Sequence, residues 1–173
     1  MSIVVEDGSI VDGANSYCTV DDLRIFATAR AITVPVSDGD CEALLIKAMD
    51  FLETLSFIGT RVSPTTQPLQ WPRENATVDG VDLDPSTVPL AVQNSEKWLA
   101  IVAQTIELQP TFSATSKGIV ASESVYGAVS RTYFQKTGSS LSPYISSVNA
   151  LLRLYLKASI PGMGALSAPV IRT

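Results

Sequence analysis

The feature that most constrains the fold is an apolar repeat at helical spacing. Apolar side chains recur three or four positions apart at Leu44, Leu45, Ala48, Phe51, Leu52 and Leu55. This spacing is typical of the buried face of one helix. The helix is expected to begin near Asp38 or Asp40 and to end before Gly59, where a residue free to adopt positive φ is favoured.

A second helix is predicted upstream of this repeat. Thr19 is its expected N-cap, and two carboxylates follow in the first turn, where they favour the positive end of the helix dipole. The helix should run to about Arg30. Its buried face is predicted to consist of Leu23, Phe26 and Ala27.

Two more helices are predicted in the second half of the chain. One begins at Ser86 or Thr87 with Pro89 in its first turn, where a missing N–H costs nothing. It continues to about Leu108 and, being apolar around most of its circumference, should be the central helix. The other begins at Ser142-Pro143.

Between these helices, residues 118–134 are rich in β-formers and predict a hairpin with its turn at Tyr126-Gly127. The predicted fold class is therefore mainly α: a bundle of about four helices with a β-hairpin insertion and extended N- and C-terminal segments. One domain is expected over residues 1–157, followed by an extended tail over residues 158–173.

The composition favours assembly over tight binding to DNA. Charged residues make up 17 % of the chain, against about a quarter in an average domain, so fewer ions need desolvating on contact with a neighbour. The net charge is −5, and the twelve Lys and Arg lie singly. Tight binding of nucleic acid requires a basic patch, whereas an acidic ring would let a duplex pass.

Catalytic and metal chemistry are not indicated. The chain has no histidine and only two widely separated cysteines, Cys18 and Cys41, which are expected to be buried thiols. Because no nucleophile–base pair can be assembled, the chain is predicted not to be an enzyme and to need no cofactor. Without a signal peptide or a membrane-spanning run, it is expected to be a soluble intracellular product.

Three stretches resemble one family of phage proteins. They are the start Ile3–Gly8 with Ala14–Tyr17, the helical segment Ala43–Leu52, and the tripeptide Trp71-Pro72-Arg73 with the preceding Leu69-Gln70. Their order and spacing resemble phage head–tail connector proteins, which are also labelled DnaT-like ssDNA-binding proteins. The resemblance covers most of the first half of the chain and continues through the helix after Val88-Pro89.

The resemblance implies a structural head-to-tail adaptor. It would form a homo-oligomeric ring of about twelve copies below the portal protein, connect the DNA-filled capsid to the tail, and let genomic DNA pass without specific binding. A stopper or tail-completion protein would dock beneath it. Its location would be the virion neck, after assembly in the bacterial host cytoplasm and without membrane contact.

The resemblance also implies roles for particular residues. Those expected to shape the fold and the ring are Tyr17, Trp71, Pro72, Arg73, Val125 and Tyr126. Trp71 is either an anchor that pins its loop or, with Arg73, an inter-subunit hot spot. The apolar tail is expected to contact the portal, unless it is simply a frayed terminus, through Ile160, Met163, Leu166, Val170, Ile171 and Arg172.

Two alternative functions stay open from the sequence. One is a neck stopper or tail-completion protein, which differs from an adaptor mainly in its position along the neck. The other is a single-stranded DNA-binding protein, which would require an electropositive groove with aromatic stacking platforms.

Overall fold

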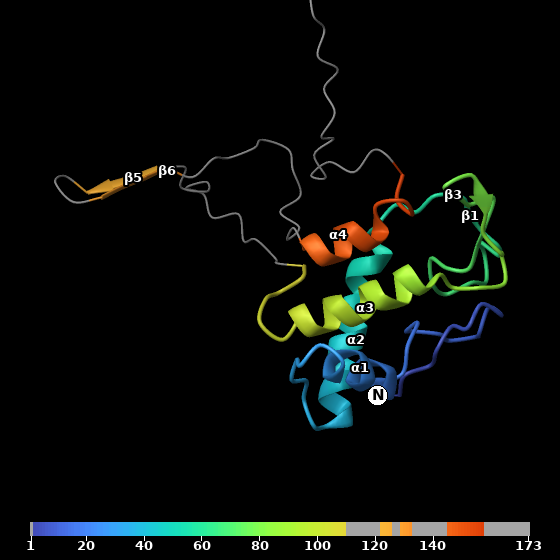
Figure 1. The fold of residues 1–173 in the computed structure, drawn as a ribbon, viewed down its shortest axis with the longest axis horizontal. Helices are drawn as coiled ribbons and strands as arrows, with labels where there is room; N and C mark the ends of the chain where they lie inside the picture. Colours follow the sequence, from blue (N-terminus) through green and yellow to red (C-terminus); the bar gives the residue numbers. More distant parts are fainter. Residues whose placement is uncertain (1, 110–121, 126–128, 133–144, 158–173) are drawn as a thin grey trace, which may run out of the picture. The chain divides into compact units, whose positions relative to one another are not determined.

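Helices dominate the part of the chain that the computed structural model describes, which is residues 2–109, 122–125, 129–132 and 145–157 (Figure 1). Within those ranges the helices are α1 (Val20–Thr28), α2 (Asp38–Glu53), α3 (Leu90–Val102) and α4 (Ser146–Leu152). The chain divides into two units, Met1–Leu108 with Pro143–Ile160, and Gln109–Ser142 with Pro161–Thr173. All four helices belong to the first unit.

The predicted starts of the first two helices are confirmed. The Thr19 side chain accepts a hydrogen bond from the Asp22 N–H, and the Asp22 carboxylate accepts one from the Thr19 N–H in return. This capping box satisfies two backbone donors that the first turn of α1 leaves free. α2 begins at Asp38, and Ser37 caps it through a hydrogen bond from the Asp40 N–H.

The third helix is shorter than predicted. α3 begins at Leu90, with Pro89 as its N-cap, and ends at Val102 instead of continuing to Leu108. Beyond its end, the N–H groups of Gln104 and Thr105 donate to carbonyls only three residues back, which is the tighter pattern of turns. Apolar content alone therefore overestimated the length of this helix.

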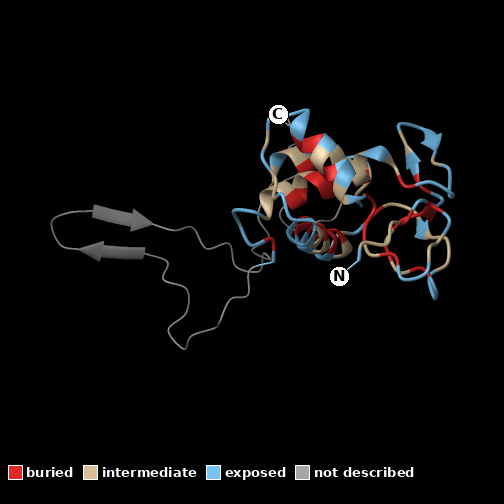
Figure 2. Ribbon diagram, turned by 90° about the horizontal axis from the view of Figure 1, so that it is seen from below, coloured by how far each residue is buried: buried red, intermediate tan, exposed pale blue. Residues whose placement is uncertain are grey.

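α3 lies at the centre of the first unit, as predicted. It packs against α1, α2 and α4, and Figure 1 shows it between α1 and α4. Figure 2 shows the buried residues gathered where the helices face one another. The side chains at 0 % exposure in this core include Leu23, Leu45, Leu52, Val92, Leu99 and Leu152.

The segment between α2 and α3 contains short strands that the sequence did not predict. β1 (Thr60–Arg61) pairs antiparallel with β2 (Arg73–Glu74), and β3 (Thr77–Val78) pairs antiparallel with β4 (Val81–Asp82). Two-residue strands are too short to show an alternating pattern in the sequence. The β1–β2 ladder closes the loop that carries Trp71.

The predicted hairpin in residues 118–134 is confirmed. β5 (Ser122–Val125) pairs antiparallel with β6 (Val129–Thr132), with Val125 opposite Val129. The expected turn residue Tyr126 lies outside the described residues, as does the Ser142-Pro143 start predicted for α4. The fold class is therefore mainly α with small antiparallel β additions.

Candidate nucleic-acid interface

Trp71 is enclosed in the core of the first unit. Its side chain is 0 % exposed and packs edge to face against Phe57 and Tyr155, with ring centroids 5.8 and 6.1 Å away. The Trp71 backbone N–H donates a hydrogen bond of 3.0 Å to the hydroxyl of Tyr17, which is itself buried. Burial raises the pKa of Tyr17 well above its ordinary value, so the hydroxyl stays neutral.

Arg73 holds the two sides of the Trp71 loop together. Its Nε donates to the carbonyl of Ile58 at 2.7 Å, and its Nη2 donates to Gly59 at 2.9 Å and to Phe57 at 3.4 Å. Its Nη1 donates to the backbone carbonyl and the side-chain oxygen of Gln70. Because the guanidinium donors are engaged inside the protein, Arg73 is not available to bind a phosphate.

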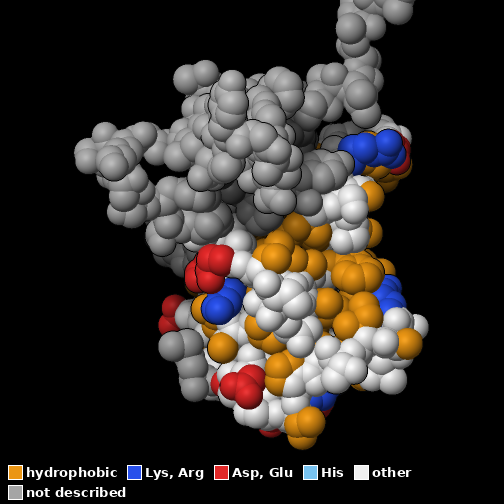
Figure 3. Space-filling model, turned by 90° about the vertical axis from the view of Figure 1, so that its left-hand side faces the viewer, with side chains coloured by type: hydrophobic (Ala, Val, Ile, Leu, Met, Phe, Trp, Pro, Cys, Tyr) orange, Lys and Arg blue, Asp and Glu red, His pale blue; other side chains and the backbone are white. Residues whose placement is uncertain are grey.

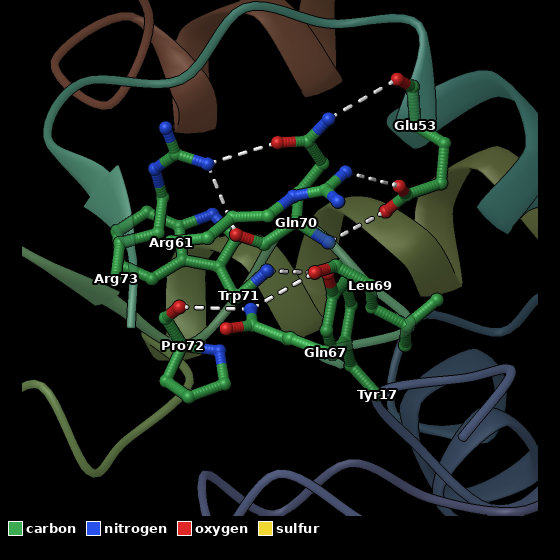
Figure 4. Close-up of polar contacts among 9 residues, drawn as sticks. All are labelled: Tyr17, Glu53, Arg61, Gln67, Leu69, Gln70, Trp71, Pro72 and Arg73. Atoms are coloured by element: carbon green, nitrogen blue, oxygen red, sulfur yellow. Dashed lines mark hydrogen bonds and ion pairs between the residues drawn. The ribbon is translucent and has the colours of Figure 1, made fainter. Parts of the chain in front are cut away.

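The neighbouring polar side chains complete this network (Figure 4). The Glu53 carboxylate accepts a hydrogen bond from the Gln70 N–H at 2.8 Å and pairs with Arg61 at 3.5 Å. Burial raises the pKa of Glu53 from its ordinary value. The Gln67 amide donates to the carbonyls of Leu69 and Pro72 at 2.9 Å each. The network therefore fixes the shape of the loop and presents no unoccupied cation.

A second buried polar group, the carboxyl of Glu96 on α3, joins the N-terminal segment to the helices. It accepts a hydrogen bond of 2.8 Å from the Tyr17 N–H and lies against the hydroxyl of Ser16. Burial raises the pKa of Glu96 to about 7. The Ser16 hydroxyl also donates to the Cys18 carbonyl at 2.7 Å, so its single proton cannot serve both acceptors. A protonated Glu96 resolves this, because it can donate to Ser16.

A cluster of two aromatic rings and two cations lies where α1 meets α3, and we call it the α1–α3 cluster. It consists of Phe26, Arg30, Lys97 and Trp98. The Phe26 and Trp98 rings meet edge to face, with centroids 5.6 Å apart and planes at 89°. The guanidinium carbon of Arg30 lies 3.4 Å from the Phe26 centroid and 5.7 Å from the Trp98 centroid. Lys97 Nζ lies 5.5 Å from the Phe26 centroid.

The α1–α3 cluster differs from the Trp71 loop in its exposure and charge. Arg30 is exposed and Trp98 is only partly buried. Among the described residues, Arg30 has no carboxylate partner: its Nη1 donates to the carbonyl of Phe26 at 2.9 Å. Sequence reasoning missed this site, although Phe26 lies in the last turns of α1 and Arg30 follows just after its end.

Hydrophobic side chains also reach the surface of the described part of the chain. On the face seen in Figure 3 they form one broad area, with the charged groups mostly at its margins. The large hydrophobic side chains that are exposed are Ile25, Val36, Val81, Leu90, Ile106 and Leu154. This agrees with the low charged fraction of the sequence.

Several residues singled out from the sequence fall outside the described part of the chain. They are Tyr126 and the whole predicted tail surface: Ile160, Met163, Leu166, Val170, Ile171 and Arg172. For Val125 the structure gives the backbone pairing with Val129. Tyr17, Trp71, Pro72 and Arg73 are brought together in one place, in the interior of the first unit.

Within residues 2–109 and 145–157, the side chains offer no cluster of three His, Cys, Asp or Glu that could hold a metal ion. Over the described residues, no helix is both long and apolar enough to cross a membrane. Both cysteines are buried free thiols, and burial raises the pKa of Cys18 and of Cys41.

Comparison with curated proteins and with solved structures gives no significant match to this chain. A family model does match, over residues 1–173, and its description is "Putative DnaT-like ssDNA binding protein". The match extends through the C-terminal part of the chain, beyond the helix after Val88-Pro89 to which the sequence resemblance extends.

This match overturns the interpretation of the chain as a phage head–tail connector. The predictions that depended on this interpretation are therefore also wrong: the ring of about twelve copies, the portal and stopper partners, and the passive passage of genomic DNA. The portal role of the tail residues depended on the same interpretation. The error arose because the three short stretches were assigned to a connector role that their residues do not encode. The chain belongs to the family of DnaT-like ssDNA-binding proteins.

Proposed function

We propose that this protein binds single-stranded DNA. The observation that carries the proposal is the family match over the whole chain. Binding without catalysis also accords with the residues available, because the chain has no histidine to act as a general base near neutral pH. We also propose that the helices form a bundle and that the N- and C-terminal segments are extended.

The distribution of charge along the sequence supports the proposal, although the net charge does not. Residues 1–108 contain six Lys and Arg against sixteen Asp and Glu, a net charge of −10. Residues 109–173 contain six Lys and Arg against one acidic residue, Glu123, a net charge of +5. Such asymmetry is typical of chains that contact nucleic acid through one part only.

The basic part of the chain is also rich in aromatic residues. It holds six of the twelve Phe, Trp and Tyr, and the stretch Arg131-Thr132-Tyr133-Phe134-Gln135-Lys136 places two aromatics between two cations. Cations neutralise the phosphates of a single strand, while aromatic rings stack on its bases. This stretch offers both kinds of group within six residues.

The binding mode expected from these groups is tolerant of sequence and sensitive to salt. Phosphate contacts release counterions and carry no base information. Stacking contributes about 1–3 kcal/mol per base and accepts every base. The acidic part of the chain would then repel DNA and limit contact to the basic part and to local cation–aromatic sites.

The test is fluorescence anisotropy of a labelled oligo(dT) titrated with the full chain at low salt. We expect saturable binding, weaker binding to a duplex of the same length, and a linear fall of log affinity with log salt concentration. Absence of binding at low salt would show the proposal to be wrong. Equal binding to the duplex would show that single strands are not the preferred ligand.

A further inference from the structure

We infer that the α1–α3 cluster is a base-stacking site for single-stranded DNA, separate from the basic C-terminal part of the chain. This inference rests on the proposed function and names a surface for it. The cluster joins an exposed guanidinium to two aromatic rings in one place. Cations and stacking rings are the groups that hold single strands.

The geometry of Arg30 is the first argument. Its guanidinium lies 3.4 Å from the centroid of the Phe26 ring, which is a stacking distance, and Phe26 itself is 7 % exposed. One side of the planar guanidinium is therefore covered by the ring, while the residue as a whole is exposed. Unstacked bases pack on arginine planes as they do on aromatic rings.

The charge of Arg30 is the second argument. In the described part of the chain, no carboxylate lies within ion-pair distance of it, whereas Arg24 on α1 pairs with Asp38 at 2.6 Å. The Nη1 bond to the Phe26 carbonyl orients the side chain, and among the described residues no carboxylate pairs with its positive charge. An exposed, oriented and unpaired cation is suited to a phosphate or to the edge of a base.

Trp98 supplies the second ring. It is partly buried, and its ring stands perpendicular to that of Phe26, with the Arg30 guanidinium carbon 5.7 Å from the Trp98 centroid. Lys97 adds a second positive charge near Phe26. Asp22 accepts hydrogen bonds from the Thr19 N–H and hydroxyl, and its charge also interacts with that of the buried Lys97, so Arg30 is the exposed cation of the cluster.

The two tryptophans give a direct readout. Trp71 is 0 % exposed and packed in the core, whereas Trp98 is partly exposed. A base that stacks at the cluster should quench the emission of Trp98 and leave that of Trp71 unchanged. We expect oligo(dT) to quench the fluorescence of the full chain, and the variant Trp98→Phe to lose this quenching while it still binds DNA in the anisotropy assay.

Affinity variants test the same site. Arg30→Ala should weaken binding to oligo(dT) by about fivefold to 160-fold, the range for one lost stacking contact of about 1–3 kcal/mol. Arg30→Lys keeps the charge but not the plane, and should fall between Arg30→Ala and the wild type. Lys47→Ala is the matched control, because it removes one exposed positive charge from α2 and should change affinity by less than about twofold.

An oligonucleotide of abasic residues with the same number of phosphates separates stacking from charge. On this ligand, Arg30→Lys and the wild type should bind equally well, because no base is left to stack. Circular dichroism and urea unfolding of each variant verify that the fold is kept, and Arg30→Lys preserves both length and charge if Arg30→Ala does not fold.

The outcomes distinguish this inference from the proposed function. If the wild type binds oligo(dT) but Trp98 is not quenched and Arg30→Ala and Arg30→Lys bind as tightly, the cluster is not the site and the proposed function stands. If the wild type does not bind at low salt, the proposed function is wrong and the inference fails with it.

Discussion

The Trp71 backbone N–H donates a 3.0 Å hydrogen bond to the hydroxyl of Tyr17, a residue 54 positions earlier in the chain. Both residues are buried, so the N–H has no access to water if this acceptor is removed. The pair therefore ties the N-terminal segment to the loop between β1 and β2, in the same place where Tyr155 packs against the Trp71 ring.

Removing this one oxygen should destabilise the fold. Tyr17→Phe leaves the Trp71 N–H buried without a partner, and we expect a loss of about 1–3 kcal/mol in the free energy of unfolding, measured in urea. Tyr155→Phe is the control: the described residues offer its hydroxyl no hydrogen bond, so it should change stability by less than about 0.5 kcal/mol. Equal losses in the two variants would contradict the assignment.

Gly59 should tolerate a side chain much less well than Gly80. Both glycines have positive φ, 68° and 80°, but a Cβ at Gly59 would lie 2.4 Å from the Glu74 carbonyl oxygen, whereas a Cβ at Gly80 would have no atom within 4 Å beyond those of the neighbouring residues in the chain. Gly80→Ala should cost about 1–2 kcal/mol, the strain of the left-handed conformation. Gly59→Ala should cost about 2–5 kcal/mol because steric overlap is added. Thermal unfolding of the two variants side by side gives the difference, and matching melting temperatures would contradict it.

Glu96 should make stability fall as the pH rises. Its pKa in the folded chain is about 7, against an ordinary value of 4.5. Below that ordinary value the group is protonated in both states. Between about pH 4.5 and 7 the unfolded chain ionises first, so this group's stabilisation is progressively lost, to a total of about 3 kcal/mol.

Unfolding in urea from pH 4.5 to 8 tests this for the wild type and Glu96→Gln. The variant cannot ionise at this position, so the difference in stability between the two proteins should change across the interval. Glu107→Gln, at an exposed position, should keep the pH profile of the wild type. Parallel profiles for the wild type and Glu96→Gln would show that Glu96 ionises alike in the folded and unfolded chain.

The charge distribution predicts where salt dependence originates. Replacing Lys117, Arg131 and Lys136 by Gln should reduce the slope of log affinity for oligo(dT) against log salt by up to about 2, at about 0.7 per phosphate contact. Replacing Arg24, Lys47 and Arg61 removes the same charge from the acidic part of the chain. This matched triple variant should leave the slope nearly unchanged, and a reversed result would assign the phosphate contacts to the acidic part.

Local signals predicted the helices well where the determinants lie close together in the sequence. The Thr19 cap, the apolar face of α1 and the start of α2 depend on neighbouring residues, and the structure has them as predicted. The end of α3 was predicted too late, because apolar residues such as Ile106 continue the pattern after the backbone has left the helix. The strands β1 to β4 depend on pairings between loop residues, which carry no local signal.

The candidate sites were less accessible to sequence reasoning. Arg73 appeared in a distinctive tripeptide, but its hydrogen bonds to the carbonyls of Ile58 and Gly59 depend on the closure of a loop. The α1–α3 cluster joins residues some 70 positions apart, since Trp98 meets Phe26 only when α1 packs on α3. The net charge also counted against DNA binding, because it averages an acidic part and a basic part of the same chain.

The place of α4 sets an order in which this protein can be made. α4 packs on α3, and the backbone of Tyr155 and of Lys157 hydrogen-bonds to the segment at Ser56 and Ile58, although residues 109–142 intervene in the chain. During synthesis, the whole stretch of residues 109–142 is therefore made before α4 can pack on α3. The core of the first unit cannot be completed until α4 has been synthesised. Until then, the apolar surface that α4 covers on α3 is accessible to chaperones and proteases.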